Sequence, residues 1–463
     1  MNRRLILLTT SLAAFLTPFT STVITFAVPG IGAEFRASFY EVIWVPLSFL
    51  IALPSFMVVL GKISDVYGRS FLFKIGFIIF IVSSILIYFS ENIYELIMYS
   101  FLSGLGGAFI GTNSTAIITS IYPEKKRGGA LGINAMSVYL GLTLAPFLGG
   151  IIIQIYGWRS IFILNLFISI VALTISFFTL KGIDQRKEEK IDIVGAVLFS
   201  SSLVLIVLFL TTMDIYGTML TFLFLISGLF LFFIFIIHEI VYETPIIDIK
   251  IFKNNRTFTF SNISAFFNYM GTFSIVFIFS IYLEIIKGID PFHAGLILSI
   301  EPILMVIFSP ISGKLSDFYG SREIAAMGAS IIGIGFLMLY FLNLNVENII
   351  FSLAIIGIGF GLFSAPNTNS VMGSVKTKNL SLASGILGTM RFTGQIFSLT
   401  IASLIISIAL PKNALMLMFT GYMISYKVSS SLLYIDAIKN VVLISAILNF
   451  ISSFNSLMKN KGE

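Results

Sequence analysis

Apolar and polar positions alternate along this chain in long blocks. Many runs of roughly 20 residues carry few or no charges, which is the length a helix needs to cross the hydrocarbon core of a bilayer. Short charged segments separate these runs. The pattern predicts an all-α polytopic membrane protein with fourteen transmembrane helices, at about residues 5–28, 43–60, 71–90, 95–121, 130–155, 160–180, 192–212, 216–238, 257–283, 293–312, 323–342, 348–370, 381–410 and 433–456.

The charged segment after the second run returns after the tenth. Residues 61–69 read Gly-Lys-Ile-Ser-Asp-Val-Tyr-Gly-Arg, and residues 313–320 read Gly-Lys-Leu-Ser-Asp-Phe-Tyr-Gly, followed by Ser321 and Arg322. We interpret each copy as a short loop in which the glycines allow a tight turn and a close approach of helices. The acid of each copy can cap a neighbouring helix N-terminus, where negative charge is favoured.

Two shorter matches extend this repeat. Residues 109–114 resemble residues 363–368, and residues 129–132 resemble residues 385–388. The offset between copies is longer than six helices require, so two additional spans fit between the repeats. We therefore predict two pseudo-symmetric six-helix bundles, 1–182 and 251–463, joined by two inserted transmembrane helices within 183–250, an arrangement typical of transporters whose halves rock about a central site.

The basic residues give the orientation. With these spans, 21 of the 28 Lys and Arg side chains lie on the side of the N-terminus, six lie on the other side, and Arg391 lies inside a span. Cytoplasmic loops of membrane proteins carry such an excess of basic residues. We expect both termini to be cytoplasmic and the protein to lie in the cell (plasma) membrane. The first run is too long for a signal-peptide core, so we expect it to remain as the first span.

Composition excludes several classes of protein. Only 11% of the residues are charged and 57% are apolar, whereas soluble proteins carry about 25% charged residues. The net charge of +6 comes from short loops and does not form the extended basic face of a nucleic-acid-binding protein. The chain has no cysteine and only two histidines, far apart, so we expect no disulfide, no metal site and no cofactor.

Further segments carry a family resemblance. Residues 141–150 read Gly-Leu-Thr-Leu-Ala-Pro-Phe-Leu-Gly-Gly, residues 157–162 read Gly-Trp-Arg-Ser-Ile-Phe, and residues 390–395 read Met-Arg-Phe-Thr-Gly-Gln. Together with the repeated motif, they resemble the major facilitator superfamily and, within it, the fourteen-helix drug:proton antiporter branch. That branch usually carries an aspartate in its first helix, at a position that reads Thr20 or Ser21 here. The resemblance therefore supplies no proton carrier from that helix.

Two charged residues inside spans are candidates for the coupling of transport, because charges deep in a membrane are expensive. Glu301 lies roughly 10 Å below the outer end of the tenth span, and Arg391 lies roughly 15 Å into the thirteenth, at about 1.5 Å per helical residue. An ion pair between them is feasible. In it, Glu301 binds a proton or a cationic substrate, and Arg391 shifts the pKa of Glu301. The alternative is a static ion pair, or a structural arginine that contacts backbone carbonyls.

Two groups of residues are candidates for gating. The resemblance implies that the repeated motif holds the inward gate closed through Gly61, Asp65, Gly68, Arg69, Gly313, Asp317 and Gly320; the alternative is a topology anchor. The antiporter-like motif on the fifth span contains Gly141, Ala145, Pro146, Gly149 and Gly150. Small residues allow close helix packing and proline permits a kink, so this motif has either a gating role or a general packing role.

Polar residues on the spans expected to face a central cavity are candidate substrate contacts: Thr17, Thr20, Asn113, Asn268 and Asn367. An apolar cavity with one acid suits lipophilic, including cationic, compounds.

The function that we predict is secondary active transport by alternating access, as proton-coupled export of hydrophobic or cationic small molecules by a monomer. The alternative is an importer or facilitator of a metabolite, such as a sugar or an organic acid, without proton coupling. An enzyme would need clustered His, Cys or carboxylate groups, which the sequence lacks. It also lacks a nucleotide-binding loop, which argues against direct drive by ATP.

Overall fold

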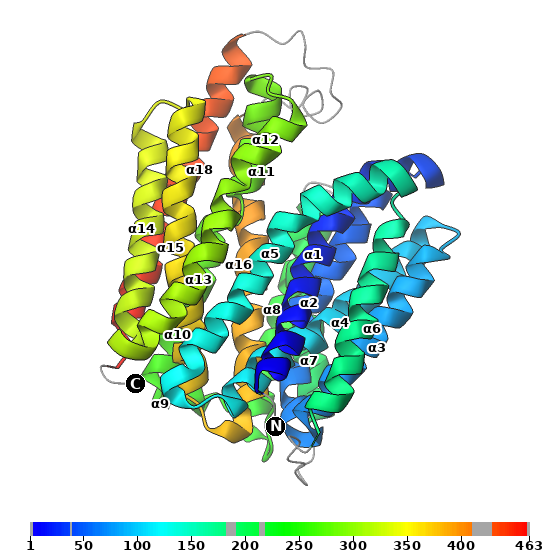
Figure 1. Cartoon of the computed structure of the whole chain (residues 1–463), viewed down its shortest axis with the longest axis vertical. Coiled ribbons are helices and arrows are strands. Elements are labelled where there is room, and N and C mark those ends of the chain that lie inside the picture. Colours follow the sequence, from blue (N-terminus) through cyan, green and yellow to red (C-terminus); the bar gives the residue numbers. More distant parts are fainter. Residues whose placement is uncertain (1–2, 38, 182–190, 213–217, 410–427, 461–463) are drawn as a thin grey trace.

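The structure, a computed structural model, describes residues 3–37, 39–181, 191–212, 218–409 and 428–460. The first six long helices form one bundle, coloured blue to teal in Figure 1. We call it the N-terminal bundle. Its helices are α1 (Arg3–Phe35), α2 (Phe39–Tyr67), α3 (Arg69–Tyr88), α4 (Ile93–Ile121), α5 (Glu124–Tyr156) and α6 (Ser160–Thr179).

The later helices form the C-terminal bundle, coloured green to red. Its elements are α9 (Lys250–Asn254), α10 (Arg256–Thr272), α11 (Ile275–Ile281), a π-turn (Tyr282–Ile286), α12 (Pro291–Leu298), α13 (Ile300–Tyr319), α14 (Ser321–Phe341), α15 (Val346–Gly373), a 3₁₀ turn (Thr377–Asn379), α16 (Leu380–Ala409) and α18 (Val428–Leu457).

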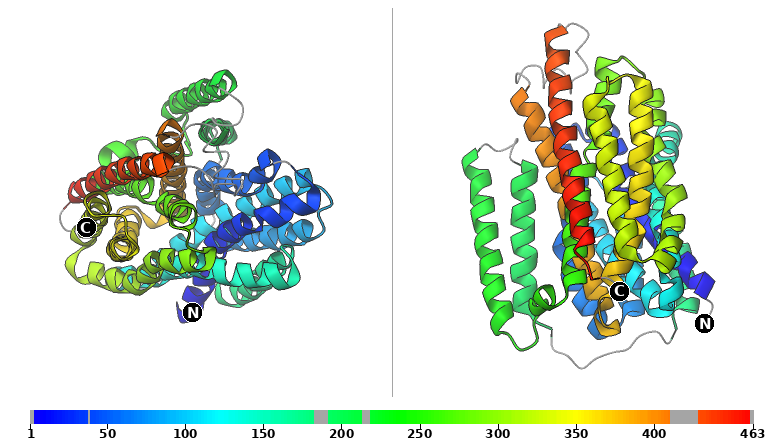
Figure 2. Two further views of the ribbon diagram at one scale, coloured as in Figure 1. Left: turned by 90° about the horizontal axis from the view of Figure 1, so that it is seen from above. Right: turned by 90° about the vertical axis from the view of Figure 1, so that its left-hand side faces the viewer.

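Two helices, α7 (Ile193–Thr212) and α8 (Thr218–Val241), stand beside the bundles as an antiparallel pair (Figure 2). They pack on both bundles through α7: Val207 is buried with Ile51 of α2 and Ile396 of α16. The hydroxyl of Thr400 on α16 also donates to the Leu210 carbonyl of α7, at 3.3 Å. The inserted pair thus covers one side of the boundary between the bundles.

Fourteen helical segments are long and apolar enough to cross a membrane in the described part of the chain, which confirms the predicted number of spans and the all-α fold. The helices are longer than the apolar runs at several ends, since charged and polar residues continue them beyond the hydrocarbon core. The ninth and tenth spans are each divided, into α10 with α11 and α12 with α13. The predicted boundaries at 182, 216 and 410 lie outside the described residues.

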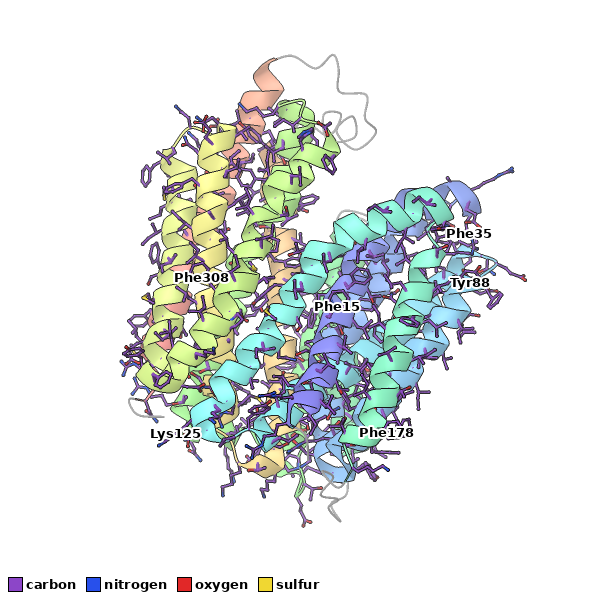
Figure 3. The ribbon with its side chains drawn as sticks, in the orientation of Figure 1. Phe15, Phe35, Tyr88, Lys125, Phe178 and Phe308 are labelled. Atoms are coloured by element: carbon purple, nitrogen blue, oxygen red, sulfur yellow. The ribbon has the colours of Figure 1, made fainter. Side chains whose placement is uncertain are left out.

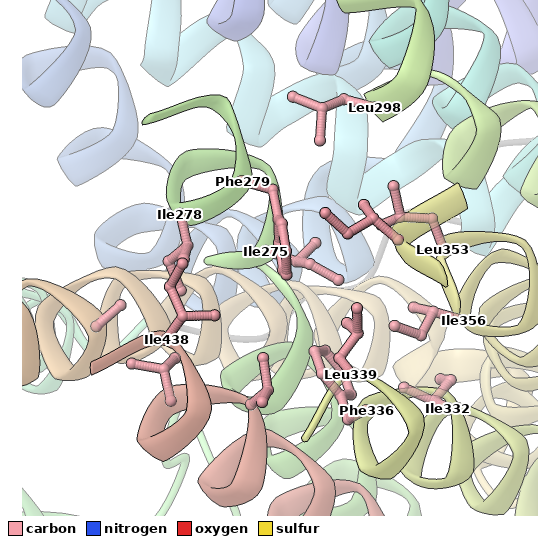
Figure 4. Close-up of a cluster of buried hydrophobic side chains, with 14 of the residues drawn as sticks. Ile275, Ile278, Phe279, Leu298, Ile332, Phe336, Leu339, Leu353, Ile356 and Ile438 are labelled. Carbon is pink, nitrogen blue, oxygen red and sulfur yellow. The ribbon is translucent and has the colours of Figure 1, made fainter. Parts of the chain in front are cut away.

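Each bundle has its own apolar core. The core of the C-terminal bundle gathers Ile275 and Phe279 of α11, Phe336 of α14 and Ile356 of α15 (Figure 4). The core of the N-terminal bundle is built likewise around Phe49, Phe73, Phe77 and Phe80. Backbone polar groups are satisfied within the helices, which is the requirement for a chain that crosses lipid.

Both termini lie at the same end of the molecule, which we call the terminal face (Figure 1). Lys125, at the start of α5, lies at this face, whereas Phe35 and Tyr88 lie at the opposite end (Figure 3). The bundles meet along α2 with α16 and α5 with α13 and diverge away from the terminal face.

Candidate functional site

The first copy of the repeated motif joins the two bundles at the terminal face. The Asp65 carboxylate, 5% exposed near the end of α2, accepts the backbone N–H groups of Ser381 (3.1 Å) and Leu382 (2.9 Å). These donors lie in the first turn of α16, whose amides have no partners within the helix. Asp65 therefore caps a helix of the opposite bundle.

Arg69 completes this contact. Its Nε and Nη2 atoms donate to the Asp65 carboxylate at 3.0 and 2.8 Å. The same guanidinium donates to the Ser381 hydroxyl (3.1 Å) and to the Thr377 carbonyl of the opposite bundle. We call this set of Asp65, Arg69, Thr377, Ser381 and Leu382 the first inter-bundle contact.

The second copy makes the same kind of contact with the bundles exchanged. The Asp317 carboxylate, near the end of α13, accepts the backbone N–H groups of Gly128 (2.7 Å) and Gly129 (2.9 Å) in the second turn of α5. Beside them, Arg127 Nε donates to the Asn369 side-chain oxygen of α15 at 2.8 Å. We call this set of Arg127, Gly128, Gly129, Asp317 and Asn369 the second inter-bundle contact.

The glycines have the two roles expected of them, but most of each motif is helix and not loop. The interpretation as short loops was wrong, because α2 runs to Tyr67 and α13 to Tyr319. A Cβ atom on Gly61 would lie 2.5 Å from the Ser381 carbonyl oxygen, and Gly313 faces Gly128 as closely. Only Gly68 (φ 116°) and Gly320 (φ 90°) make the turns, with backbone angles that favour glycine.

The structure does not pair Glu301 with Arg391. Glu301 lies in the first turn of α13 and is 3% exposed, and its Oε2 atom has no hydrogen-bond partner. Arg391 donates instead to the Thr368 hydroxyl and lies over the Tyr269 ring, 5.5 Å from its centroid. The proposed ion pair is therefore absent from the described residues in this conformation.

The motif on the fifth span packs α5 against α1. A Cβ atom on Gly141 would lie 2.6 Å from the Phe15 carbonyl oxygen, and one on Gly149 would lie 3.1 Å from the Val23 side chain. Ala145 is fully buried with Phe19 and Val23. Pro146 and Gly150 lie within the same helix. The small side chains let the two helices approach within one bundle.

The five polar cavity candidates are buried between helices in this conformation, with Thr17 and Thr20 7% and 1% exposed and the three asparagines fully buried. Asn113 donates to Ser64 (2.9 Å) and Asn268 to Asn449 (2.8 Å). Asn367 donates to the Ser261 carbonyl at 3.1 Å. The structure therefore does not bring the five together as the wall of one open cavity.

A cluster of three aromatic residues that no sequence pattern predicted lies where the bundles meet. Tyr139 of α5 and Tyr269 of α10 each meet the Phe360 ring of α15 edge to face, with ring centroids 5.9 and 5.1 Å apart. Tyr139 comes from the N-terminal bundle and the other two from the C-terminal bundle. In a chain with 48 Phe and 17 Tyr, no sequence signal distinguishes these three.

Two buried polar clusters were also missed. At the inserted pair, His238 Nε2 lies 2.8 Å from Asp192 Oδ2. The Asp192 carboxylate also accepts a hydrogen bond from the Gly195 N–H of α7, and the Glu239 carboxylate accepts one from the Ile247 N–H. At the end of the chain, Lys459 is 3% exposed and donates to Asn367 (3.0 Å) and Ser370 (3.4 Å). Burial lowers the pKa of Lys459 to about 7, although Glu323 opposes this shift.

The Gly-Trp-Arg segment fastens the opposite end of the N-terminal bundle. Trp158 Nε1 donates to Glu34 (2.7 Å), and Arg159 binds the same carboxylate and the Ser90 carbonyl (2.7 Å). Burial raises the pKa of Glu34, but the hydrogen bonds from Arg159 and Trp158 outweigh it and hold the pKa below its ordinary value. This contact stays within one bundle.

An apolar groove of about 460 Å³ runs between α2 and α7, lined by Phe56, Val59, Ala196, Val197, Ser200, Ser201, Val204 and Leu205. It contains neither Glu301 nor Arg391. In the part of the chain that the structure describes, no three His, Cys, Asp or Glu side chains are placed to hold a metal ion.

Comparison with known proteins places the chain in a family. The family model described as Major Facilitator Superfamily matches residues 10–252 and 262–452. The riboflavin transporter RibZ of Clostridioides difficile is 30% identical over 391 residues, which cover 84% of each chain. The multidrug transporter protein MdtP of Bacillus subtilis is 26% identical, over 86% of this chain and 74% of that protein.

The solved structures agree on the fold. The crystal structure of the human organic anion transporter MFSD10 (TETRAN) superimposes with a TM-score of 0.69 at 13% identity, over 98% of this chain and 100% of the other. An identity this low shows the fold alone. With nearly the whole sequence matched by the family model and the same fold in solved transporters, the chain belongs to the major facilitator superfamily of secondary transporters.

Proposed function

We propose that this transporter exports hydrophobic small molecules in exchange for protons, and that the two inter-bundle contacts form its gate at the terminal face. The observation that carries the proposal is the matched pair of carboxylate contacts with backbone N–H groups, Asp65 at the start of α16 and Asp317 in the second turn of α5. Each joins opposite bundles and each lies at the same face, where the bundles are closest.

The energetics of these contacts suit a gate. A hydrogen bond to a charged group contributes about 1.5–3 kcal/mol, and a carboxylate at a helix N-terminus gains up to about 1 kcal/mol from the helix dipole. Both caps must break before the bundles can separate at the terminal face. An inward-open state therefore needs compensating contacts at the opposite face, which is the two-state behaviour that alternating access requires.

Glu301 is the proposed proton-binding group. Its carboxyl is buried within a membrane span, and Oε2 has no partner. Intramembrane acids of this kind are functional candidates by default. The Glu301 backbone also packs closely on α15, since a Cβ atom on Gly357 would lie 2.5 Å from the Glu301 carbonyl oxygen. A change in the charge of Glu301 would therefore act on the contact between α13 and α15.

The test uses purified protein in vesicles with an imposed pH gradient. We expect Glu301→Gln to abolish gradient-driven accumulation of a lipophilic substrate and to leave counterflow without a gradient. Glu323→Gln is the matched control, because its side chain is 56% exposed at the start of α14. Undiminished gradient-driven transport by Glu301→Gln would remove this residue as the coupling group.

A second candidate function is transport of a flavin-like metabolite without proton coupling. It is favoured by the 30% identity to a riboflavin transporter over 84% of both chains. Radiolabelled riboflavin that equilibrates across the vesicle membrane without a pH gradient, together with no transport of lipophilic compounds, would establish it over the first candidate.

We further propose that the protein works as a monomer in the plasma membrane with both termini in the cytoplasm. With this orientation, the terminal face is cytoplasmic, and the conformation described above is the one closed to the cytoplasm. The excess of basic residues on the side of the N-terminus supports this orientation.

A further inference from the structure

Arg391 and the aromatic cluster form one site between the bundles. The guanidinium lies 5.5 Å from the centroid of the Tyr269 ring, and Tyr269 meets Phe360, which in turn meets Tyr139 of the other bundle. Arg391 lies roughly 15 Å along α16 from its start, which is near the middle of a hydrocarbon core about 30 Å thick. The site is therefore central in depth and shared by both bundles.

The positive charge at this site has no carboxylate partner among the described residues. Arg391 donates to the neutral Thr368 hydroxyl, and its Nε atom is buried without an acceptor. The guanidinium stays protonated in proteins, so the charge is permanent. A free donor and an uncompensated charge in a membrane interior leave a place for an anionic or hydrogen-bond-accepting group of a ligand.

Glu301 does not cancel this charge through direct contact. Its backbone abuts Gly357, one helical turn before Phe360 on α15, but its Oε2 atom binds nothing and Arg391 binds elsewhere. The side chains of Glu301 and Arg391 are thus not locked to each other. A ligand can meet the arginine without first breaking an ion pair.

The three rings favour a flat partner. Edge-to-face contacts present both ring faces and ring edges, and a planar aromatic ligand can replace or extend such a contact at little cost in shape. The planar fork of the guanidinium binds carboxylates with two parallel hydrogen bonds. A lipophilic cation would satisfy the rings but would meet the repulsion of Arg391.

We propose that this site selects planar aromatic molecules that carry an anionic edge, and that it discriminates against aromatic cations of the same size. The inference rests on the proposed function, because it names the substrate class of that transporter. It also replaces the expectation from the sequence that the cavity suits cationic compounds.

The test compares two bicyclic aromatic probes of similar size, 2-naphthoate and N-methylquinolinium, by equilibrium binding to the full chain in lipid nanodiscs at fixed ionic strength. We expect the wild type to bind 2-naphthoate at least tenfold more tightly. Arg391→Gln should reduce this ratio at least tenfold, and Arg391→Lys should retain a preference for the anion. Tyr269→Leu should weaken the binding of both probes alike, because it removes an aromatic ring from the site and leaves the charge of Arg391.

Arg256→Gln is the matched control. Arg256 also lies over an aromatic ring, 5.6 Å from the Phe260 centroid, but it is exposed at the first residue of α10. Its substitution should leave the ratio unchanged. Melting temperatures of the variants establish that they are folded.

Three results would overturn the inference: tighter binding of the cation, an unchanged ratio in a folded Arg391→Gln variant, or no binding of either probe at millimolar concentration. The proposed function fails separately. Anion-selective binding without any pH-driven flux would remove proton coupling and keep the charge preference. Transport of the cation driven by a pH gradient would keep proton coupling and remove the charge preference.

Discussion

The two inter-bundle contacts come from one repeated motif, yet only the first contains an ion pair. Asp65 and Asp317 each accept two backbone N–H groups near the start of a helix in the opposite bundle, with oxygen–nitrogen distances of 2.7–3.1 Å. Arg69 follows the glycine of the first copy and binds Asp65. Ser321 occupies the matching position of the second copy.

In the second contact, the arginine comes from the bundle opposite to the acid. Arg127 precedes the capped amides of Gly128 and Gly129 on α5 and reaches Asn369 on α15. In the first contact the arginine lies on the same side as the acid, and in the second it lies on the side of the capped helix. The two copies of the repeat therefore share the carboxylate contact with backbone N–H groups and differ in the position of the arginine.

The largest expected effect follows from Asp65→Asn. The variant loses the charged cap and also leaves Arg69 without its carboxylate, so it forfeits about 1.5–3 kcal/mol. We expect the closed terminal face to open at least tenfold more often. Because the chain has no cysteine, the single thiol of Leu382→Cys can report opening by its rate of alkylation in purified protein.

Leu382 suits this purpose because the contact uses its backbone N–H, while its side chain is buried in an apolar cluster with Val58 and Val59 of α2. An alkylation rate in Asp65→Asn equal to that of the Leu382→Cys parent would show that the cap does not hold the face closed.

Asp317→Asn should act in the same direction and less strongly. The side chain of asparagine keeps one carbonyl oxygen, so one of the two N–H groups keeps an acceptor, and no ion pair is lost with the charge. We expect about a fivefold faster alkylation, which corresponds to about 1 kcal/mol. An effect larger than that of Asp65→Asn would reverse the proposed ranking of the two contacts.

Arg69→Gln removes the ion pair from the first contact, so that both contacts then depend on a carboxylate bound to backbone N–H groups. The Arg69 side chain is 12% exposed, and a partly exposed ion pair contributes about 0.5–1 kcal/mol, so we expect alkylation about threefold faster. In the Arg69→Gln background, Asp65→Asn should raise the alkylation rate by about the same factor as Asp317→Asn does in the wild type. A double-mutant cycle that shows no coupling between Asp65 and Arg69 would contradict the role assigned to the arginine.

The sequence predicted the repeated caps well because their determinants are local. Asp65 and Asp317 follow long apolar runs at matched positions, and a carboxylate near a helix end has few other partners to choose from. Hydropathy likewise predicted the fourteen spans, since lipid demands long helices. Hydropathy did not predict the breaks within two of these spans, at Phe273 and at Ser299.

The candidate site was less predictable because it depends on the rotation of helices. Depth along a span placed Glu301 and Arg391 near each other, but depth does not tell which face of a helix a side chain occupies. Arg391 turns to Thr368 and Tyr269 instead. For the same reason Asn268 faces α18 and not a cavity, and the rings of Tyr139 and Phe360 meet without any distinguishing pattern in the sequence.

The smallest expected effect on the gate separates the asparagines of the repeat, Asn113 and Asn367. Asn113 accepts a weak hydrogen bond from Ser381 of the first inter-bundle contact (3.4 Å), whereas Asn367 accepts one from Lys459 of its own bundle (3.0 Å). Burial lowers the pKa of Lys459 to about 7, below its unfolded value of 10.5. The folded state then binds fewer protons between these values, so stability from this group rises with pH through that window.

Lys459→Met removes the titration. We expect the wild type to gain stability relative to the variant between pH 7 and 9, by at most about 1.4 kcal/mol per pH unit, and the gap to stay constant below about pH 6. Thermal melting of both proteins across this range measures it, and a constant gap throughout would contradict the buried, readily deprotonated lysine. Alkylation of Leu382→Cys should remain unchanged by Lys459→Met, because this lysine supports α15 within one bundle while the gate contacts join two.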